Sequence, residues 1–189
     1  MVKVSNKHTI GIGYNRECYH HPENRKLCIK VDLPGTPSTD SQREKKYYLH
    51  LLKRNVSWDM VPKYHGDIKT NIGLGSVYDL ILNDDGSVSG TLENYLKANN
   101  DFKHVIKPFF ELKAYLLQQR IIVGTLYPRN LLCQITEKKI TKLVLCDAIG
   151  SSDFIPLCNY SRYFAEKKIN RKWQQFEKRL INDYAIKLP

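Results

Sequence analysis

Four polar side chains, spread over most of the chain, are of the types that bind a nucleotide and its metal ion. Lys30 lies in the apolar stretch 27–31, and Glu44 falls in the first turn of the helix expected next. Asn130 precedes one apolar stretch, and Asp147 follows another. A lysine holds the α- and β-phosphates, a glutamate orients that lysine, and aspartate and asparagine supply oxygen ligands to Mg²⁺. These types therefore indicate a nucleotide site with Mg²⁺.

Each of these residues alone also fits a purely structural role. Lys30 is a typical strand-end lysine, and Glu44 is favoured near a helix N-terminus by the helix dipole. Asn130 and Asp147 are common turn residues, because their side chains bond the nearby backbone. Their order favours the site: a strand lysine, a helical glutamate, a loop asparagine and an aspartate before Gly150 follow one another as in a protein-kinase nucleotide site.

The first part of the chain predicts strands with one helix. The helix is expected at 41–54, with Thr39 or Asp40 as its N-cap, because its apolar residues recur at helical spacing. Short alternating or apolar stretches bounded by turn residues predict strands. They lie within 8–19 and at 27–31, 63–69 and 75–82.

The later part of the chain predicts mainly helices. A strong turn signal at 83–87 precedes it, and Pro108 fits a long helix at 103–119 only if it lies in the first turn. A short helix is expected through Lys97, a small hairpin from the strands 131–135 and 143–146, and a basic helix or helix pair over 161–185. Strands followed by helices indicate an α+β fold.

Composition limits the class of protein. The chain has 189 residues and a formal charge of +11, and hydrophobic residues make up 42%. This length fits one domain, and this apolar content excludes wholesale disorder. The sequence shows no apolar run that could span a bilayer and no secretory signal at its start, so we expect a cytoplasmic protein.

The cysteines are read first as small buried apolar side chains. There are five, an odd number, and no pair has zinc-knuckle spacing. Metal or redox chemistry is the alternative reading. The adjacent His20 and His21 would point to opposite faces of a strand, which is poor geometry for one metal ion.

The C-terminal stretch 161–189 carries eight Lys or Arg against three acidic residues. Apolar residues alternate with them at helical spacing. This pattern predicts a terminal helix that packs its apolar stripe on the protein and leaves a basic face in solvent. The alternatives are a protein or anionic partner at this segment; nucleic acid is the less favoured one, because aromatic residues at helical spacing usually belong to a core.

Many short motifs along the chain, in order, resemble the bacterial YrbL family, named for the PhoP regulatory network. The resemblance covers nearly the whole chain. The motifs that carry it include 16–22, 28–30, 43–48, 62–66, 70–73, 77–81, 126–132, 146–150, 155–157 and 171–173.

This resemblance implies a minimal bilobal protein-kinase-like fold, with an antiparallel-sheet N-lobe and a shortened, mainly helical C-lobe. The single domain would have its N-lobe at about 1–82, a hinge at about 83–88 and its C-lobe at about 89–189. The stretch 27–30 resembles the V-A-I-K strand, which makes Lys30 the phosphate lysine and Glu44 its ion-pair partner.

The remaining site residues follow from the same resemblance. Asn130 and Asp147 would be the metal ligands, although the glycine of D-F-G arrives one residue late. Gly11 and Gly13 match two glycines of the phosphate loop. The third glycine position is Arg16, which would reach a phosphate or block the site.

The catalytic apparatus departs from the kinase pattern. Thr125 stands where kinases carry the catalytic-loop aspartate, and a threonine hydroxyl does not ionise near pH 7. Asp67 and Asp153 are other carboxylates that would have to replace it. The sequence thus favours a pseudokinase that binds MgATP between two lobes. The alternatives are an active ATP-dependent phosphotransferase and a basic regulatory adaptor without nucleotide binding.

Overall fold

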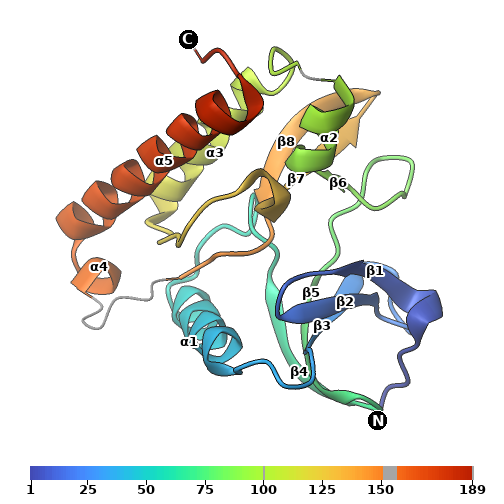
Figure 1. The fold of residues 1–189 in the computed structure, drawn as a ribbon. Helices are drawn as coiled ribbons and strands as arrows, with labels where there is room; N and C mark the ends of the chain where they lie inside the picture. Colours follow the sequence, from blue (N-terminus) through green and yellow to red (C-terminus); the bar gives the residue numbers. More distant parts are fainter. Residues whose placement is uncertain (100, 151–156, 189) are drawn as a thin grey trace.

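The computed structural model describes residues 1–99, 101–150 and 157–188, and the side chain of residue 157 is left out of the description. Among the described residues, an antiparallel five-stranded sheet and one α-helix form the first part, and four further α-helices with a small three-stranded sheet follow (Figure 1). This is a mixed α+β architecture, as the order of the sequence patterns predicted. Among the described helices, none is long and apolar enough to cross a membrane.

The larger sheet has the strand order β1-β2-β3-β5-β4. The strands β1 and β2, β2 and β3, and β4 and β5 pair as hairpins. Because β5 inserts between β3 and β4, β3 lies at the centre of the sheet. The strands are β1 (Thr9–Ile12), β2 (Arg16–His20), β3 (Leu27–Asp32), β4 (Tyr64–Thr70) and β5 (Gly73–Asp79).

The helix α1 (Thr39–Lys53) leaves β3 through a proline-containing loop. It begins two residues earlier than predicted, and its N-cap is Ser38, whose side chain makes no capping hydrogen bond. The predicted cap at Thr39 or Asp40 is therefore wrong. The Ser41 hydroxyl instead donates to Ser38 O at 2.9 Å and to Asp32 Oδ2 at 2.8 Å, which fixes the first turn from inside the helix.

The smaller sheet has the order β6-β7-β8, and its hairpin β7–β8 is the one that the sequence predicted. The predicted turn at 83–87 packs on this hairpin, because Asn83 Oδ1 accepts from Ile135 N at 2.9 Å. The bounds are β6 (Gly90–Thr91), α2 (Leu92–Asn99), α3 (Ile106–Gln119), β7 (Leu131–Thr136) and β8 (Lys139–Leu145).

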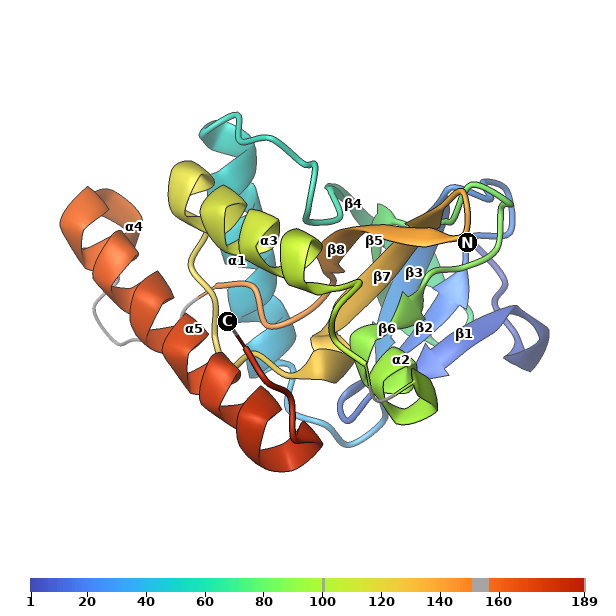
Figure 2. The ribbon, with the colours of Figure 1, turned by 90° about the horizontal axis from the view of Figure 1, so that it is seen from above.

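The C-terminal stretch forms α4 (Leu157–Tyr160) and one long helix, α5 (Arg162–Tyr184). Figure 2 shows α5 beside α3, with the five-stranded sheet at the other end of the molecule. Most of the predicted apolar stripe of α5 is buried, which confirms that the helix packs on the protein: Ile169, Trp173, Phe176 and Leu180 are buried. Phe164, the first residue predicted for the stripe, is 43% exposed, and the neighbouring Ala165 is buried instead.

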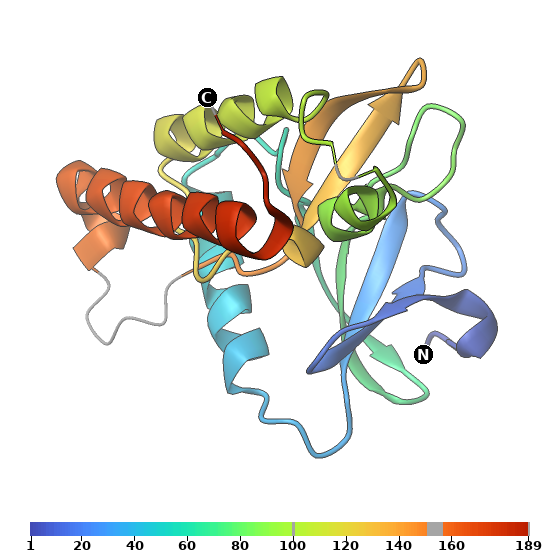
Figure 3. The same ribbon diagram turned by 45° about the horizontal axis from the view of Figure 1, so that its top comes forward.

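One hydrophobic core connects the two ends of the molecule. It joins α1 with β3 and β5 on one side and with α2, α3, β7, β8 and α5 on the other. Figure 3 shows α1 standing between the five-stranded sheet and the helices. The opposite face of the sheet has its own small apolar cluster, made of Val4, Tyr19, Ile29, Val31 and Val77.

Candidate functional site

The predicted site residues come from separate elements that meet where the five-stranded sheet faces the rest of the molecule. Lys30 lies on the central strand β3, and Glu44 lies on α1. Asn130 closes the 3₁₀ turn Pro128–Asn130 before β7, and Asp147 follows β8 by two residues. Arg16, the first residue of β2, reaches into the same place.

Arg16 is the centre of the ion pairs in this site. Its Nη2 lies 2.5 Å from Glu44 Oε2 and 2.8 Å from Asp147 Oδ1. The side chains of Arg16 and Glu44 are 14% and 8% exposed, so this pair is largely shielded from solvent. A guanidinium has several donors in one plane and can satisfy two carboxylates at once. Arg16 thereby ties β2 to α1 and to the segment that follows β8.

The sequence predicted an ion pair between Lys30 and Glu44, but Lys30 has other partners in the structure. Its Nζ donates to the carbonyl oxygen of Cys146 at 2.6 Å and lies 5.1 Å from the centre of the Tyr78 ring. The reason is Arg16, whose long side chain takes the partner that the lysine would have. The predicted Lys30–Glu44 ion pair is therefore replaced by Arg16–Glu44.

The charges in the site change one another's proton affinity. Burial raises the pKa of Glu44, and this effect outweighs the nearby cations Arg16 and Lys30. Burial alone would raise the pKa of Asp147 as well, but Lys30 and Arg16 lower it below its ordinary value. Burial opposes the charge on Lys30, yet the Asp147 carboxylate raises its pKa, so both cations stay protonated at neutral pH.

Three buried polar atoms near Glu44 have no hydrogen-bond partner among the described residues. They are the second carboxylate oxygen of Glu44 (Oε1) and the hydroxyl groups of Tyr48 and Tyr78. Burial and the charge of Glu44 raise the pKa of both tyrosines. The Glu44 carboxylate and the two tyrosine hydroxyls thus form a buried polar cluster next to the Arg16–Glu44 pair.

Asn130 lies next to the segment that carries Asp147. The Cys146 backbone N–H donates to Asn130 O at 2.9 Å, and the Cys146 thiol donates to the same oxygen at 3.2 Å. The Asn130 side-chain amide bonds none of the described residues, and the Asp147 side chain is 46% exposed. The Asn130 backbone thus lies beside the segment that carries Asp147, and a carboxylate and an amide oxygen are ligand types that Mg²⁺ takes together with phosphates.

The loop that carries Thr125 runs antiparallel to the loop after Asp147. Gly124 N donates to Ala148 O, and Gly150 N donates to Ile122 O, each at 2.8 Å. Thr125, which the kinase resemblance aligns with a catalytic aspartate, is exposed. Of the substitutes considered, Asp153 lies outside the described residues. Asp67 lies on β4 and is held by Lys45, Tyr64 and Ser76.

Gly11 and Gly13 are exposed and flank the turn that leads into β2. Gly13 N donates to Arg16 O at 2.8 Å, which closes this turn and sets the direction of the Arg16 side chain. A Cβ at position 13 would lie 3.2 Å from the same oxygen, so the tight turn favours glycine. Tyr14, at the tip, is 96% exposed and stays out of the site.

The sequence reasoning missed Tyr47, which links α1 to the Thr125 loop. Its hydroxyl accepts a hydrogen bond from Ile122 N at 2.7 Å, and burial raises its pKa to about 12. Gly150, at a φ of +106°, lies so close that an added Cβ would be 3.2 Å from Tyr47 Cβ. The available signal was its spacing: three residues after Glu44, Tyr47 shares that face of the helix.

Two of the basic residues predicted to form a solvent-exposed face on α5 have other roles. Lys168 is buried, and the Arg179 guanidinium donates to Leu126 O and stacks 4.0 Å from the Tyr127 ring centre. The exposed members of the set are Lys167, Arg171 and Lys178. The positive charge of this helix therefore partly serves to hold the loop between Thr125 and Asn130.

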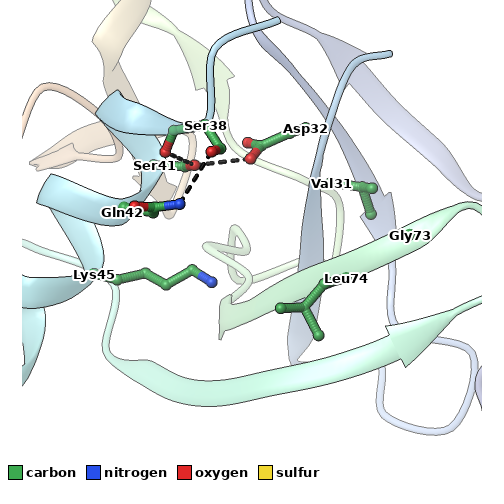
Figure 4. Close-up of a pocket in the computed structure, with 8 residues that line it drawn as sticks. All are labelled: Val31, Asp32, Ser38, Ser41, Gln42, Lys45, Gly73 and Leu74. Carbon is green, nitrogen blue, oxygen red and sulfur yellow. Dashed lines mark hydrogen bonds between the residues drawn. The ribbon is translucent and has the colours of Figure 1, made fainter. Parts of the chain in front are cut away.

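A cavity of about 240 Å³ lies on the other side of α1, between the start of this helix and the sheet (Figure 4). Gln42 Nε2 donates to Ser38 Oγ at 3.0 Å across its rim. The volume is below that of most ligand pockets, and the polar groups around it already bond one another. Its lining residues are Val31, Asp32, Ser38, Ser41, Gln42, Lys45, Gly73 and Leu74.

Comparison with known proteins agrees with the family resemblance of the sequence motifs. The family model described as PhoP regulatory network protein YrbL matches residues 2–181. The uncharacterized protein YrbL of Escherichia coli K12 is 37% identical over 182 residues, which cover 93% of this chain and 86% of the relative. The protein of the same name from Shigella flexneri matches to the same extent. The chain therefore belongs to the YrbL family.

Proposed function

We propose that this YrbL-family protein binds MgATP between the five-stranded sheet and the helical part, as a protein-kinase-like regulatory protein that does not transfer phosphate. The observation that carries the proposal is the convergence of Lys30, Arg16, Glu44 and Asp147, from four separate elements, at one place. Two cations beside a carboxylate that remains 46% exposed supply what a metal-bound triphosphate requires.

Each residue has a distinct role in this proposal. Asp147 and Asn130 hold Mg²⁺ through their side-chain oxygens, which neutralises part of the phosphate charge. Lys30 and Arg16 bind phosphate oxygens, Arg16 by two parallel hydrogen bonds. Because Arg16 occupies one oxygen of Asp147, it turns from this carboxylate to the phosphates when MgATP binds. Glu44 then becomes available to Lys30, whose amine lies in the same cluster of charges.

The proposed protein is a pseudokinase because of position 125. Thr125 supplies no carboxylate to accept a hydroxyl proton, a contribution that is typically worth about 10²- to 10⁴-fold in rate. We expect nucleotide binding to act through a change in the relative position of the sheet and the helices, in a cytoplasmic protein. The alternative, phosphotransfer to an unknown acceptor, predicts ADP formation that depends on Asp147.

Calorimetric titration with ATP, with and without Mg²⁺, tests the proposal. The wild-type chain should bind only when Mg²⁺ is present, and Lys30→Met and Asp147→Asn should abolish the heat of binding. Lys45→Met is the matched control, because this partly exposed lysine pairs with Asp67 at 2.8 Å, outside the site, and it should bind as the wild type does.

Circular dichroism of all variants ensures that a loss of binding is not a loss of folding. A wild-type chain that shows no binding at millimolar ATP would overturn the proposal and favour the basic adaptor. Binding that persists in both site variants would place the nucleotide elsewhere. ADP release by the wild type, absent in Asp147→Asn, would favour the phosphotransferase instead.

A further inference from the structure

Three of the five cysteines gather on the sheet face that carries Lys30. In the β2–β3 register Cys18 is directly opposite Lys30, and Cys28 precedes Lys30 by two residues, so all three side chains share one face of the sheet. Cys146 provides the carbonyl oxygen that Lys30 bonds. A grouping of thiols around a cation is not required by packing, since any small apolar residue would fill these positions.

The thiols of Cys18 and Cys28 interact directly. The Cys28 thiol donates to Asp79 O at 3.7 Å and lies beside the Cys18 sulfur. The neighbouring Cys28 lowers the pKa of Cys18, with Lys30 and Arg16 acting in the same direction, while burial and the Asp147 carboxylate oppose the effect. The neighbouring Cys18, together with burial, raises the pKa of Cys28. The two sulfurs are therefore unequal, and Cys18 is the one that carries thiolate character.

Accessibility divides the pair in the same way. Cys18 is half-buried, whereas Cys28 is 5% exposed and lies in the hydrophobic core. A partly exposed thiol of lowered pKa, with a second thiol next to it, is the arrangement that oxidants attack selectively. Cys133 provides the contrast within the same chain, because it is 3% exposed and burial raises its pKa to about 12.

We propose that Cys18 is a peroxide-reactive thiol and that Cys28 is its resolving thiol, so that oxidation links β2 to β3 beside Lys30. In the first step the Cys18 sulfur attacks a peroxide oxygen, the O–O bond breaks, and Cys18 becomes a sulfenic acid while one water leaves. In the second step the Cys28 sulfur attacks the Cys18 sulfur, the S–O bond breaks, and a second water carries away the hydroxyl and the thiol proton. The peroxide is the oxidant, and it accepts both electrons.

The geometry of the sheet makes this bond a labile one. Cys18 and Cys28 are diagonal neighbours, and such residues lie about 7–8 Å apart between Cα atoms. This separation is at or just beyond the upper end of the range found in disulfides, so closing the bond draws the two strands together. Strained disulfides are easily reduced, which suits a reversible modification. The proposal stands independently of nucleotide binding.

The test uses the full reduced chain, hydrogen peroxide and mass spectrometry. The wild type should lose two hydrogen atoms. Trypsin, which cleaves after Arg16, Arg25, Lys26 and Lys30, should then release residues 17–25 joined to residues 27–30. Cys28→Ser should instead gain one oxygen atom at residue 18 and react with dimedone. Cys18→Ser should remain unmodified under the same conditions.

Two controls separate a specific site from general thiol oxidation. Cys133→Ser should behave as the wild type does, since it removes a buried thiol outside the pair. In Lys30→Met, circular dichroism should show that the fold is retained, and Cys18 should react with an alkylating reagent several-fold more slowly than in the wild type. Oxidation of Cys18→Ser at the wild-type rate, a bond from Cys18 to Cys146, or peroxide consumption at Cys133 would each overturn the proposal.

Discussion

At the scale of single residues, Arg16 organises the charges of the site. Its guanidinium lies between Glu44 and Asp147, at 2.5 and 2.8 Å. The sequence allowed the prediction that these residues would meet, because their types and order are those of a phosphate and metal site. It could not identify the partner of Glu44, since that depends on how far Arg16 extends from the start of β2.

The Arg16–Glu44 ion pair should contribute strongly to the stability of the fold, and removing both charges should cost less stability than removing one. Arg16→Met leaves the buried Glu44 carboxylate without its partner, and breaking a buried pair on one side costs about 3–5 kcal/mol. Urea unfolding of Arg16→Met should show a loss of this size. The double variant Arg16→Met with Glu44→Gln should recover a large part of it, because no unpaired charge remains. A double variant as unstable as Arg16→Met alone would contradict this account.

At the scale of elements, the sequence predicted most of the secondary structure. Alternation and turn residues located β1 to β5, and helical spacing with Pro108 in the first turn located α3. The start of α1 was predicted wrongly, because an internal hydrogen bond of Ser41 replaces the N-cap that Thr39 or Asp40 would have made. Contacts between elements, such as Tyr47 with Ile122, are set by the three-dimensional packing and have only a spacing signal in the sequence.

Asp67 joins α1 to the β4–β5 hairpin and should make that junction sensitive to acid. Burial would raise its pKa, but hydrogen bonds from Lys45, Tyr64 and Ser76 lower it below its ordinary value of 3.8. The carboxylate therefore stabilises the fold above pH 3.8, and this contribution is lost as the pH falls through the lower pKa of the folded state.

The variant Asp67→Asn measures this contribution. At neutral pH it should lower the free energy of unfolding by about 1 kcal/mol, a modest value because the side chain is partly exposed. The difference from the wild type should shrink as the pH falls through the lowered pKa of the folded state. Lys45→Met, which removes the partner at 2.8 Å, should weaken the pH dependence without abolishing it, because Tyr64 and Ser76 still bond the carboxylate. A difference that persists in acid would point to packing rather than charge.

At the scale of the whole molecule, the continuous core predicts that the sheet and the helices unfold together. The two tryptophans sample different parts of it: Trp58 stacks on Tyr48 of α1, and Trp173 of α5 packs 4.5 Å from Phe109. In Trp58→Phe and in Trp173→Phe, the fluorescence of the remaining tryptophan should change at the same urea concentration as the far-ultraviolet circular dichroism. Separate midpoints in either variant would show two independently stable units.

The helix α1 also has a mechanical consequence. Glu44 and Tyr47 stand three residues apart, about 4.5 Å along the helix axis, and each holds a different part of the protein: Glu44 holds β2 through Arg16, and Tyr47 holds the Thr125 loop through Ile122 N. A rigid helix carries both attachments when it moves. A force applied at the start of β2 is therefore transmitted through the helix to the Thr125 loop, in addition to the route through Asp147 and the Ala148–Gly124 hydrogen bond.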